Sequence, residues 1–446
     1  MNTTAEPASL KRVVGVGALG FNAVNMTVAS GIFALPALMA AALGSAAVSA
    51  YLVCIVLFGL VGLCFAEAGS RVGGAGGLYA YATTSFGPVL GGIAGNLAWI
   101  AGGAAADAAI INLLFDTLAT VIPVLSQSWI RTLFMLGLFG VVAITNIRGV
   151  RYGVRLSVLM TLIKIAPLVA LVIVGAFFID PSQLKWTHVP AVSSIGAASV
   201  AAFYTFMGVE AALSMSGEVV RPARTVPRGI LMGLLIIGAI YVGVQLVAQG
   251  TMGAALADSK TPLVDTARIV FGPWGGTFMV VALALSASGC IAGDLLSSPR
   301  VPFALAERSQ LPRSLAYVHP RFGTPAVAIA AYAVVCAVLA ISGSFELMLV
   351  LSSAGVLIVY LICCVGVLRL RAVKITHDAE TFIARGGPLI PLAAAVIIIW
   401  MLWSLVLDAM HQHQWKEIFF AGGFVVLLAA AYYVLERRRN VSSHRP

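Results

Sequence analysis

The sequence predicts an all-α polytopic membrane protein with twelve transmembrane helices. Three observations support this fold class: an apolar composition, a series of long apolar segments, and an uneven distribution of the basic residues. The chain of 446 residues is 60% hydrophobic and only 10% charged, whereas a soluble protein carries about 25% charged residues. Its mean hydropathy of +1.01 is that of an integral membrane protein.

The chain contains twelve apolar segments of roughly the length of a membrane span. A straight helix needs about 20 residues to cross the hydrocarbon core. The third segment is clearly longer, which predicts a tilted helix or one that extends beyond the membrane. The twelve segments are 13–42, 47–69, 88–122, 130–147, 153–179, 193–219, 229–250, 275–297, 325–342, 347–370, 388–407 and 417–435.

The basic residues support this count of segments. Cytoplasmic loops of membrane proteins carry an excess of lysine and arginine. With twelve spans, both termini lie on one side, and nearly all of the 27 lysines and arginines fall on that side, which predicts cytoplasmic termini. The exceptions are Arg131, Lys185, Lys260, Arg268 and Lys416 on the opposite side and Lys164 within a span.

The composition also argues against other classes of protein. The net charge of +10 comes from the basic loops of one side, so it indicates topology and not nucleic-acid binding. All six cysteines fall in apolar segments and are interpreted as small buried side chains. We expect no cofactor and no cleavable signal peptide. No ATP-binding motif is present, so transport would depend on gradients or exchange.

The first segment is interrupted at its centre by the small residues of Val28-Ala29-Ser30-Gly31-Ile32-Phe33. A Ser-Gly pair in mid-membrane weakens the helix and frees backbone N–H and C=O groups, which neighbouring helices or a ligand must satisfy. Taken alone, the pair is more typical of a kink or a small-residue packing face. A second break in a matching position favours a binding site instead.

The sixth segment contains such a break, where Gly208 lies near mid-span and is followed by Glu210. Segments one and six are five apart, so the two interrupted helices hold corresponding positions in two five-helix halves, which is typical of inverted-repeat transporters. Exposed N–H groups at a half-helix start can hold a carboxylate, and freed carbonyls can hold an ammonium. The two breaks therefore predict a midplane site for a zwitterion.

The predicted organisation follows from this repeat. We expect a multi-pass protein of the cytoplasmic (inner) membrane with both termini in the cytoplasm. Its parts are an N-terminal tail over 1–12, a first five-helix repeat over 13–190, an inverted second repeat over 191–370, two further helices over 371–436, and a C-terminal tail over 437–446.

Several motifs, in one order along the chain, resemble those of the amino acid–polyamine–organocation permeases. Ser30-Gly31-Ile32-Phe33 resembles the first-helix signature of this family, and Phe206-Met207-Gly208-Val209-Glu210 resembles its sixth helix. The matches run from about Val13 to Pro325. Other matching stretches are Glu67-Ala68-Gly69, Gly76 to Tyr81, Phe86-Gly87-Pro88, Asn146 to Val150, Glu218 to Pro227, and Leu311-Pro312.

The resemblance implies the LeuT-like fold, with segments one to five and six to ten as inverted repeats and two C-terminal helices appended. It also implies that the backbone N–H groups around Ser30, Gly31 and Ile32 face the substrate carboxylate, and that the carbonyls near Thr27, Tyr204 and Met207 face the ammonium. Tyr204 takes the position of an aromatic gate in a relative. The implied substrate-binding residues are Thr27, Val28, Ala29, Ser30, Gly31, Ile32, Phe203, Tyr204, Met207 and Gly208.

Lys164 and Glu210 are candidate coupling or gating residues, because ionisable side chains inside the membrane are costly and usually functional. By the resemblance, Lys164 fills the place of a sodium ion and reaches toward the first break. It is either a proton-responsive substitute for sodium or a permanent tether between segments five and one. Glu210 starts a half-helix, where the dipole favours a carboxylate. Either it moves a proton or gates the site, or it only stabilises the break.

Other acids are less specific. Asp107 in segment three and Asp294 in segment eight are possible cavity acids, which would favour a substrate with extra positive charge; the alternative is that each is solvated or locally paired. We expect Glu67 to anchor the loop between segments two and three, and Asp116 to lie near the outer mouth of segment three. No histidine falls within a predicted span, and no metal site is expected.

These observations predict a secondary active amino-acid permease that works by alternating access, without sodium, through proton symport or substrate antiport. Two alternatives stay open: an exchanger of cationic amino acids or polyamines, and a substrate-sensing receptor on a transporter scaffold. An enzyme is not expected, because no catalytic cluster falls at membrane depth. The expected partners are an amino-acid substrate, a proton or counter-substrate and membrane lipids, but no nucleic acid, with the chain as a monomer or homodimer.

Overall fold

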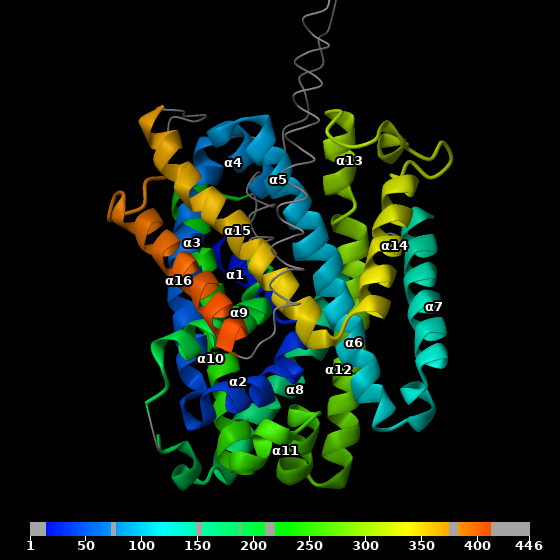
Figure 1. Ribbon diagram of the computed structural model, residues 1–446, viewed down its shortest axis with the longest axis vertical. Coiled ribbons are helices and arrows are strands. Elements are labelled where there is room, and N and C mark those ends of the chain that lie inside the picture. Colours follow the sequence, from blue (N-terminus) through cyan, green and yellow to red (C-terminus); the bar gives the residue numbers. More distant parts are fainter. Residues whose placement is uncertain are drawn as a thin grey trace, which may run out of the picture.

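A computed structural model describes residues 15–72, 77–148, 154–186, 189–209, 219–373 and 382–411. Within these ranges the regular elements are helices, and most of them run along the long axis of the molecule (Figure 1). Short helices lie at the two ends of this bundle. The helices labelled α4 and α13 lie at the upper end in this view, and α2 and α11 lie at the lower end.

The first half of the chain forms an interrupted first helix, a long second helix and then a series of antiparallel spans. Its helices are α1 (Val16–Thr27), the 3₁₀ turn Ser30–Phe33, α2 (Leu35–Leu43), α3 (Val48–Arg71), α4 (Gly77–Phe86), α5 (Pro88–Trp99), the π-helical stretch Ile100–Ala105, α6 (Ala106–Ala119), α7 (Ser128–Ile147) and α8 (Val154–Gly175).

The second half begins with α9, which ends at Phe206 inside the sixth predicted segment, and residues 210–218 behind it lie outside the described ranges. Its helices are α9 (Val192–Phe206), α10 (Pro222–Met252), α11 (Pro262–Phe271), α12 (Pro273–Ser297), α13 (Arg300–Glu307), α14 (Ala326–Ser342), α15 (Phe345–Ala372) and α16 (Leu389–His411). Several start with proline, namely α5, α10, α11 and α12. Proline suits a first helical position because its missing N–H has no acceptor there.

The observed helices support a polytopic membrane protein. Among the described residues, seven helices are long and apolar enough to cross a membrane, and four shorter apolar helices accompany them. Two of the shorter ones, α2 and α9, belong to the interrupted segments. The predicted twelfth segment, 417–435, lies outside the described residues, so the count of twelve spans stays a prediction.

Three features differ from a simple series of spans. The third predicted segment is divided into α5 and α6 by the π-helical stretch Ile100–Ala105. Three additional helices, α4, α11 and α13, fill connections that the apolar segments leave open. The Gly102-Gly103 pair lies inside the π-helical stretch, and single-turn π-helices of this kind are frequent at functional sites.

The first half-helix, α1, packs directly on α10 through glycine. A Cβ atom added to Gly233 of α10 would lie 3.0 Å from the Gly20 carbonyl oxygen, and one added to Gly20 would lie 3.1 Å from the Gly229 carbonyl oxygen. The backbones of the two helices are therefore in contact. Such close approach of small residues is typical of helix packing within membranes.

Candidate functional site

The two predicted breaks are present at the expected residues. Helix α1 ends at Thr27, and the chain continues through Val28 and Ala29 in extended conformation before the 3₁₀ turn Ser30–Phe33 begins. Helix α9 ends at Phe206, and the next residue, Met207, has an extended backbone conformation. Both interruptions therefore free backbone groups in mid-segment, as expected for discontinuous transmembrane helices.

The two breaks lie against each other. Gly208 has a φ of +107°, a conformation that L side chains rarely adopt. A Cβ atom at Gly208 would lie 2.5 Å from the Met26 carbonyl oxygen and 3.2 Å from the Thr27 Cα atom. Only glycine fits here, because it combines this backbone conformation with the close approach of another backbone.

Tyr241 of α10 joins the ends of both half-helices. Its hydroxyl oxygen lies 3.2 Å from the Thr27 carbonyl oxygen and 2.9 Å from the Thr205 carbonyl oxygen. The single hydroxyl proton is therefore shared between two carbonyls that the breaks release from helical hydrogen bonding. Tyr241 is fully buried, and its ring packs edge-on against Phe206. The sequence analysis did not identify this residue.

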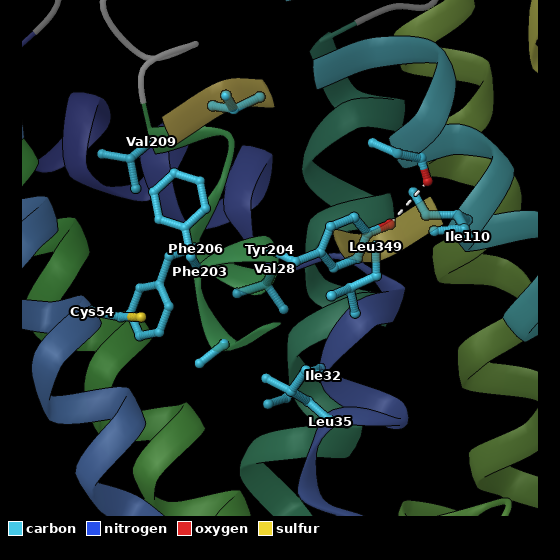
Figure 2. Close-up of a cluster of buried hydrophobic side chains, with 14 of the residues drawn as sticks. Val28, Ile32, Leu35, Cys54, Ile110, Phe203, Tyr204, Phe206, Val209 and Leu349 are labelled. Carbon is cyan, nitrogen blue, oxygen red and sulfur yellow. Dashed lines mark hydrogen bonds between the residues drawn. The ribbon is translucent and has the colours of Figure 1, made fainter. Parts of the chain in front are cut away.

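Tyr204 covers the first break. Its hydroxyl donates a hydrogen bond of 2.9 Å to the Ala106 carbonyl on α6, which the dashed line in Figure 2 marks. A Cβ atom at Gly31 would lie 2.8 Å from Tyr204 Cε1, so the ring rests directly on Gly31. Figure 2 also shows that Phe203 and Phe206 point away from Tyr204, toward Cys54 and Val209. The Phe203 ring stacks on Phe58 at 4.9 Å.

Polar groups at the first break lack partners. The hydroxyl oxygens of Thr27 and Ser30 are buried, and neither has a hydrogen-bond partner among the described residues. The N–H groups at the start of the turn Ser30–Phe33 have no acceptor within the turn. Buried polar groups normally find partners, so unsatisfied ones at one place indicate a position for a polar ligand or water.

Lys164 of α8 is buried beside α12. Its Nζ atom donates to the Cys290 Sγ atom at 3.3 Å, and its side chain is 8% exposed. The two carboxylates Asp107 and Asp294 lie on α6 and α12 and interact with each other and with Cys290 electrostatically. The structure thus brings the predicted ionisable residues of three segments into one region. Glu210, the remaining candidate, lies outside the described residues.

Glu67 lies away from this region, in a buried ion cluster at the end of α3. Its carboxylate accepts two hydrogen bonds from Arg371 of α15, at 2.7 and 2.6 Å. It also pairs with Arg71 at 3.1 Å and accepts from the Ala384 backbone N–H. We expected Glu67 to anchor the loop after α3; residues 73–76 of that loop lie outside the described residues, so this stays a prediction. The contacts of Glu67 that the structure describes join α3 to α15 and to the chain before α16.

Asp116 also has a structural contact. It forms an ion pair with Arg131 that joins α6 to α7.

The predicted substrate-binding residues are gathered around the two breaks, and most of them are buried. Those with low exposure are Thr27, Val28, Ser30, Gly31, Ile32, Phe203 and Tyr204, whereas Ala29, Met207 and Gly208 are partly exposed.

Comparison with known proteins gives the same assignment over nearly the whole chain. The family model described as amino acid permease matches residues 14–431. The chain is 28% identical over 420 residues to the serine/threonine exchanger SteT of Bacillus subtilis, covering 91% of this chain and 94% of that protein. It is 24% identical over 418 residues to the branched-chain amino acid permease BcaP of the same organism, covering 90% of each chain.

A third relative shows that the group includes other substrates. The methylthioribose transporter of Bacillus subtilis is 23% identical over 419 residues, covering 91% of each chain. The full-length family match, the apolar helices and the paired breaks agree with one another. The chain is therefore a multi-pass membrane protein that belongs to the amino acid permease family of the amino acid–polyamine–organocation superfamily.

Proposed function

We propose that this protein is a secondary active amino-acid transporter that works by alternating access, without sodium, and couples transport to protons or to exchange of a second substrate. The proposal includes twelve spans in the LeuT-like inverted arrangement, in the cytoplasmic membrane, with both termini in the cytoplasm. Membership of the amino acid permease family supports the substrate class. The arrangement of the two breaks supports the mechanism.

The contact between the two breaks is the observation that carries this proposal. At one place it combines N–H groups near Ser30 that have no acceptor within the turn, the carbonyl oxygens of Thr27 and Thr205, and the Ser30 hydroxyl, which has no partner among the described residues. The N–H groups match a carboxylate, and the helix dipole adds to that attraction. A carbonyl oxygen that already accepts from Tyr241 keeps a second lone pair for an ammonium. An α-amino acid zwitterion satisfies both.

Tyr204 supplies the gate in this mechanism. Because its ring rests on Gly31, a substrate carboxylate can approach the first break only when the ring moves away. That movement breaks the hydrogen bond from the Tyr204 hydroxyl to the Ala106 carbonyl. Binding therefore exchanges one set of contacts for another at the junction of α9, α6 and the first break, as a gated site requires.

Lys164 supports independence from sodium. An ammonium group buried in the membrane already supplies a positive charge in the region between α8 and α12. By the family resemblance it stands where sodium-coupled relatives hold the ion. A second cation beside it would be repelled, since like charges at short range in a medium of low dielectric cost several kcal/mol. The proposed coupling is therefore to protons or to a counter-substrate.

A second candidate function is exchange of cationic amino acids or polyamines. The observation that favours it is the pair of acids Asp107 and Asp294, which interact with each other near the breaks. A substrate with a second ammonium could neutralise one of them. The names of two relatives, a serine/threonine exchanger and a branched-chain amino acid permease, favour neutral substrates instead.

Uptake by purified protein in proteoliposomes tests the proposal. Radiolabelled serine, leucine, lysine and putrescine would be offered at fixed pH, with sodium or with choline in its place, to liposomes preloaded with the same compound or empty. The proposal predicts uptake of one amino-acid class that is unchanged by sodium. Uptake that requires sodium would refute the coupling proposed here, and uptake of putrescine and lysine alone would select the second candidate.

A further inference from the structure

Asp107 is a buried carboxylate in the membrane interior that the mechanism above does not use. It is the second residue of α6, directly after the π-helical stretch Ile100–Ala105, and its side chain is 0% exposed. Its Oδ2 atom accepts a hydrogen bond from the Tyr332 hydroxyl at 2.9 Å and a weaker one from Cys336 Sγ at 3.9 Å, both on α14. Its Oδ1 atom is buried without a donor among the described residues.

No basic side chain pairs with Asp107 within the described ranges. Asp107 takes no part in the ion pairs formed by Glu67, Asp116 and Asp265, and the Lys164 ammonium is directed to Cys290. The charged group that interacts with Asp107 is another carboxylate, Asp294. A lone carboxylate buried in the membrane costs several kcal/mol, and a second carboxylate beside it adds to that cost.

The other groups around Asp107 offer no compensating charge. The turn Ser30–Phe33 and the π-helical stretch, which both pack against α6, contain no titratable residue. On α15, Tyr360 packs against the rings of Phe58 and Phe65 of α3, and Glu346 is exposed. The titratable groups that face Asp107 are therefore Asp294 and Cys290 of α12, Tyr332 and Cys336 of α14, and Tyr204 of α9.

Local packing shows that the approach of Tyr332 to Asp107 is built into the fold. A Cβ atom at Gly103 would lie 2.7 Å from the Tyr332 hydroxyl oxygen, so a larger residue would displace that hydroxyl. The π-helical stretch thus provides both the glycine that admits Tyr332 and the register that turns Asp107 toward it. Such stretches are concentrated at functional sites.

Tyr204 connects Asp107 with the substrate site. Its hydroxyl donates to the carbonyl of Ala106, the residue directly before Asp107, while its ring covers Gly31. A substrate that moves the ring from Gly31 also removes this hydrogen bond from the backbone beside Asp107. On the other side, Asp294 is partly exposed at the end of α12 and provides a polar step from Asp107 toward water.

We infer that Asp107 is the group that carries the proton during transport, and that Tyr204 couples its protonation to occupancy of the paired breaks. This inference rests on the proposed function. Asp107 crosses the occluded state as a neutral carboxylic acid because, among the described residues, no basic side chain pairs with it and the Lys164 ammonium is directed to Cys290. On the side where the substrate enters, Asp107 takes up a proton from water. On the releasing side it gives the proton to water by way of Asp294 and becomes a carboxylate again. One proton thus crosses with each substrate molecule in net uptake, and none crosses in exchange.

Two transport assays on one set of proteoliposomes test this inference. The first measures substrate accumulation and proton entry, with an internal pH dye, under an imposed inward proton gradient. The second measures exchange of labelled for unlabelled substrate without a gradient. Asp107→Asn keeps the size and neutrality of the protonated side chain. We expect its proton entry to fall to the level of protein-free liposomes and its accumulation to stop at equal concentrations, while exchange continues.

Asp116→Asn is the matched control, because Asp116 lies on the same helix but pairs with Arg131 near its end. It should accumulate substrate and admit protons as the wild type does. Infrared difference spectra of the wild type give an independent readout that needs no variant. Substrate binding should change the carbonyl band of a protonated carboxylic acid, and that band should be missing in Asp107→Asn.

The outcomes separate this inference from the proposed function. Wild-type uptake without proton entry, unchanged proton entry in Asp107→Asn, or the absence of a protonated-carboxyl band in the wild type would each overturn the role of Asp107 and leave amino-acid transport standing. Failure of the wild type to move any amino acid would instead reject the proposed function, and the role of Asp107 with it.

Discussion

Replacing Gly208 by alanine tests whether contact between the two breaks forms the site. The added Cβ atom would lie 2.5 Å from the Met26 carbonyl oxygen. Real Cβ contacts essentially never fall below 3.0 Å, so the two backbones would have to move apart by at least 0.5 Å. In addition, alanine would have to adopt a φ of +107°, which L residues rarely do.

The cost of this change can be worked from two contributions. A left-handed conformation costs an L residue about 1–2 kcal/mol, and forcing extra atoms into a packed site costs about 1–3 kcal/mol. Together they amount to about 2–5 kcal/mol. The variant can relieve this strain by moving the two breaks apart. Substrate binding then has to bring the breaks together again, which costs the same free energy. We therefore expect at least about tenfold weaker substrate binding, since about 1.4 kcal/mol corresponds to a factor of ten.

The assay is equilibrium binding of a labelled amino acid to purified protein, together with thermal unfolding in the same detergent. Gly137→Ala is the matched control, because Gly137 lies in the interior of α7 and a Cβ atom there meets nothing within 4 Å. The control should bind as the wild type does. A Gly208→Ala protein with wild-type affinity would refute the view that the two breaks form the substrate site by backbone contact.

Four further changes give distinct expectations. Tyr241→Phe removes the hydroxyl that donates to the buried carbonyls of Thr27 and Thr205. This loss costs about 1–3 kcal/mol, so the unfolding temperature should fall. An unchanged unfolding temperature would show that the hydroxyl is not needed. Glu67→Gln should lower the free energy of unfolding by about 3–5 kcal/mol, because it leaves buried arginine charge unpaired. Its control is Asp265→Asn, in a more exposed pair with Arg268, which should cost at most about 1 kcal/mol. Equal losses of stability in the two variants would contradict this distinction. Gly31→Val should insert normally but bind no substrate, because the new side chain collides with Tyr204; measurable affinity would place the site elsewhere. Lys164→Met should abolish uptake, and transport at the wild-type rate would remove Lys164 from the mechanism.

The sequence was sufficient to predict the two breaks, because small residues inside a long apolar run are conspicuous. Gly31 and Gly208 are the residues whose missing side chains the structure uses, one against the Tyr204 ring and the other against the Met26 backbone. The family assignment is confirmed by a match over residues 14–431. Among the described residues, the long apolar helices also follow the predicted segments, whereas α4, α11 and α13 lie between them.

Other features depend on contacts that no local pattern contains. Tyr241 lies in an ordinary apolar run, and only the fold brings its hydroxyl to both breaks. Arg371, which pairs with Glu67, lies on α15, about 300 residues later in the chain, and no local pattern around Glu67 indicates it. The π-helical stretch was missed because a glycine pair in an alanine-rich helix is compatible with regular α-helix as well.

A binding-competition panel on purified wild-type protein tests the central claim most directly. It would compare neutral, cationic and anionic amino acids with putrescine at two pH values, with and without sodium, and repeat the best competitor on Gly31→Val. The account predicts tight binding of one amino-acid class, unaffected by sodium and lost in Gly31→Val. Binding of amines alone, or binding that requires sodium or survives in Gly31→Val, would contradict it.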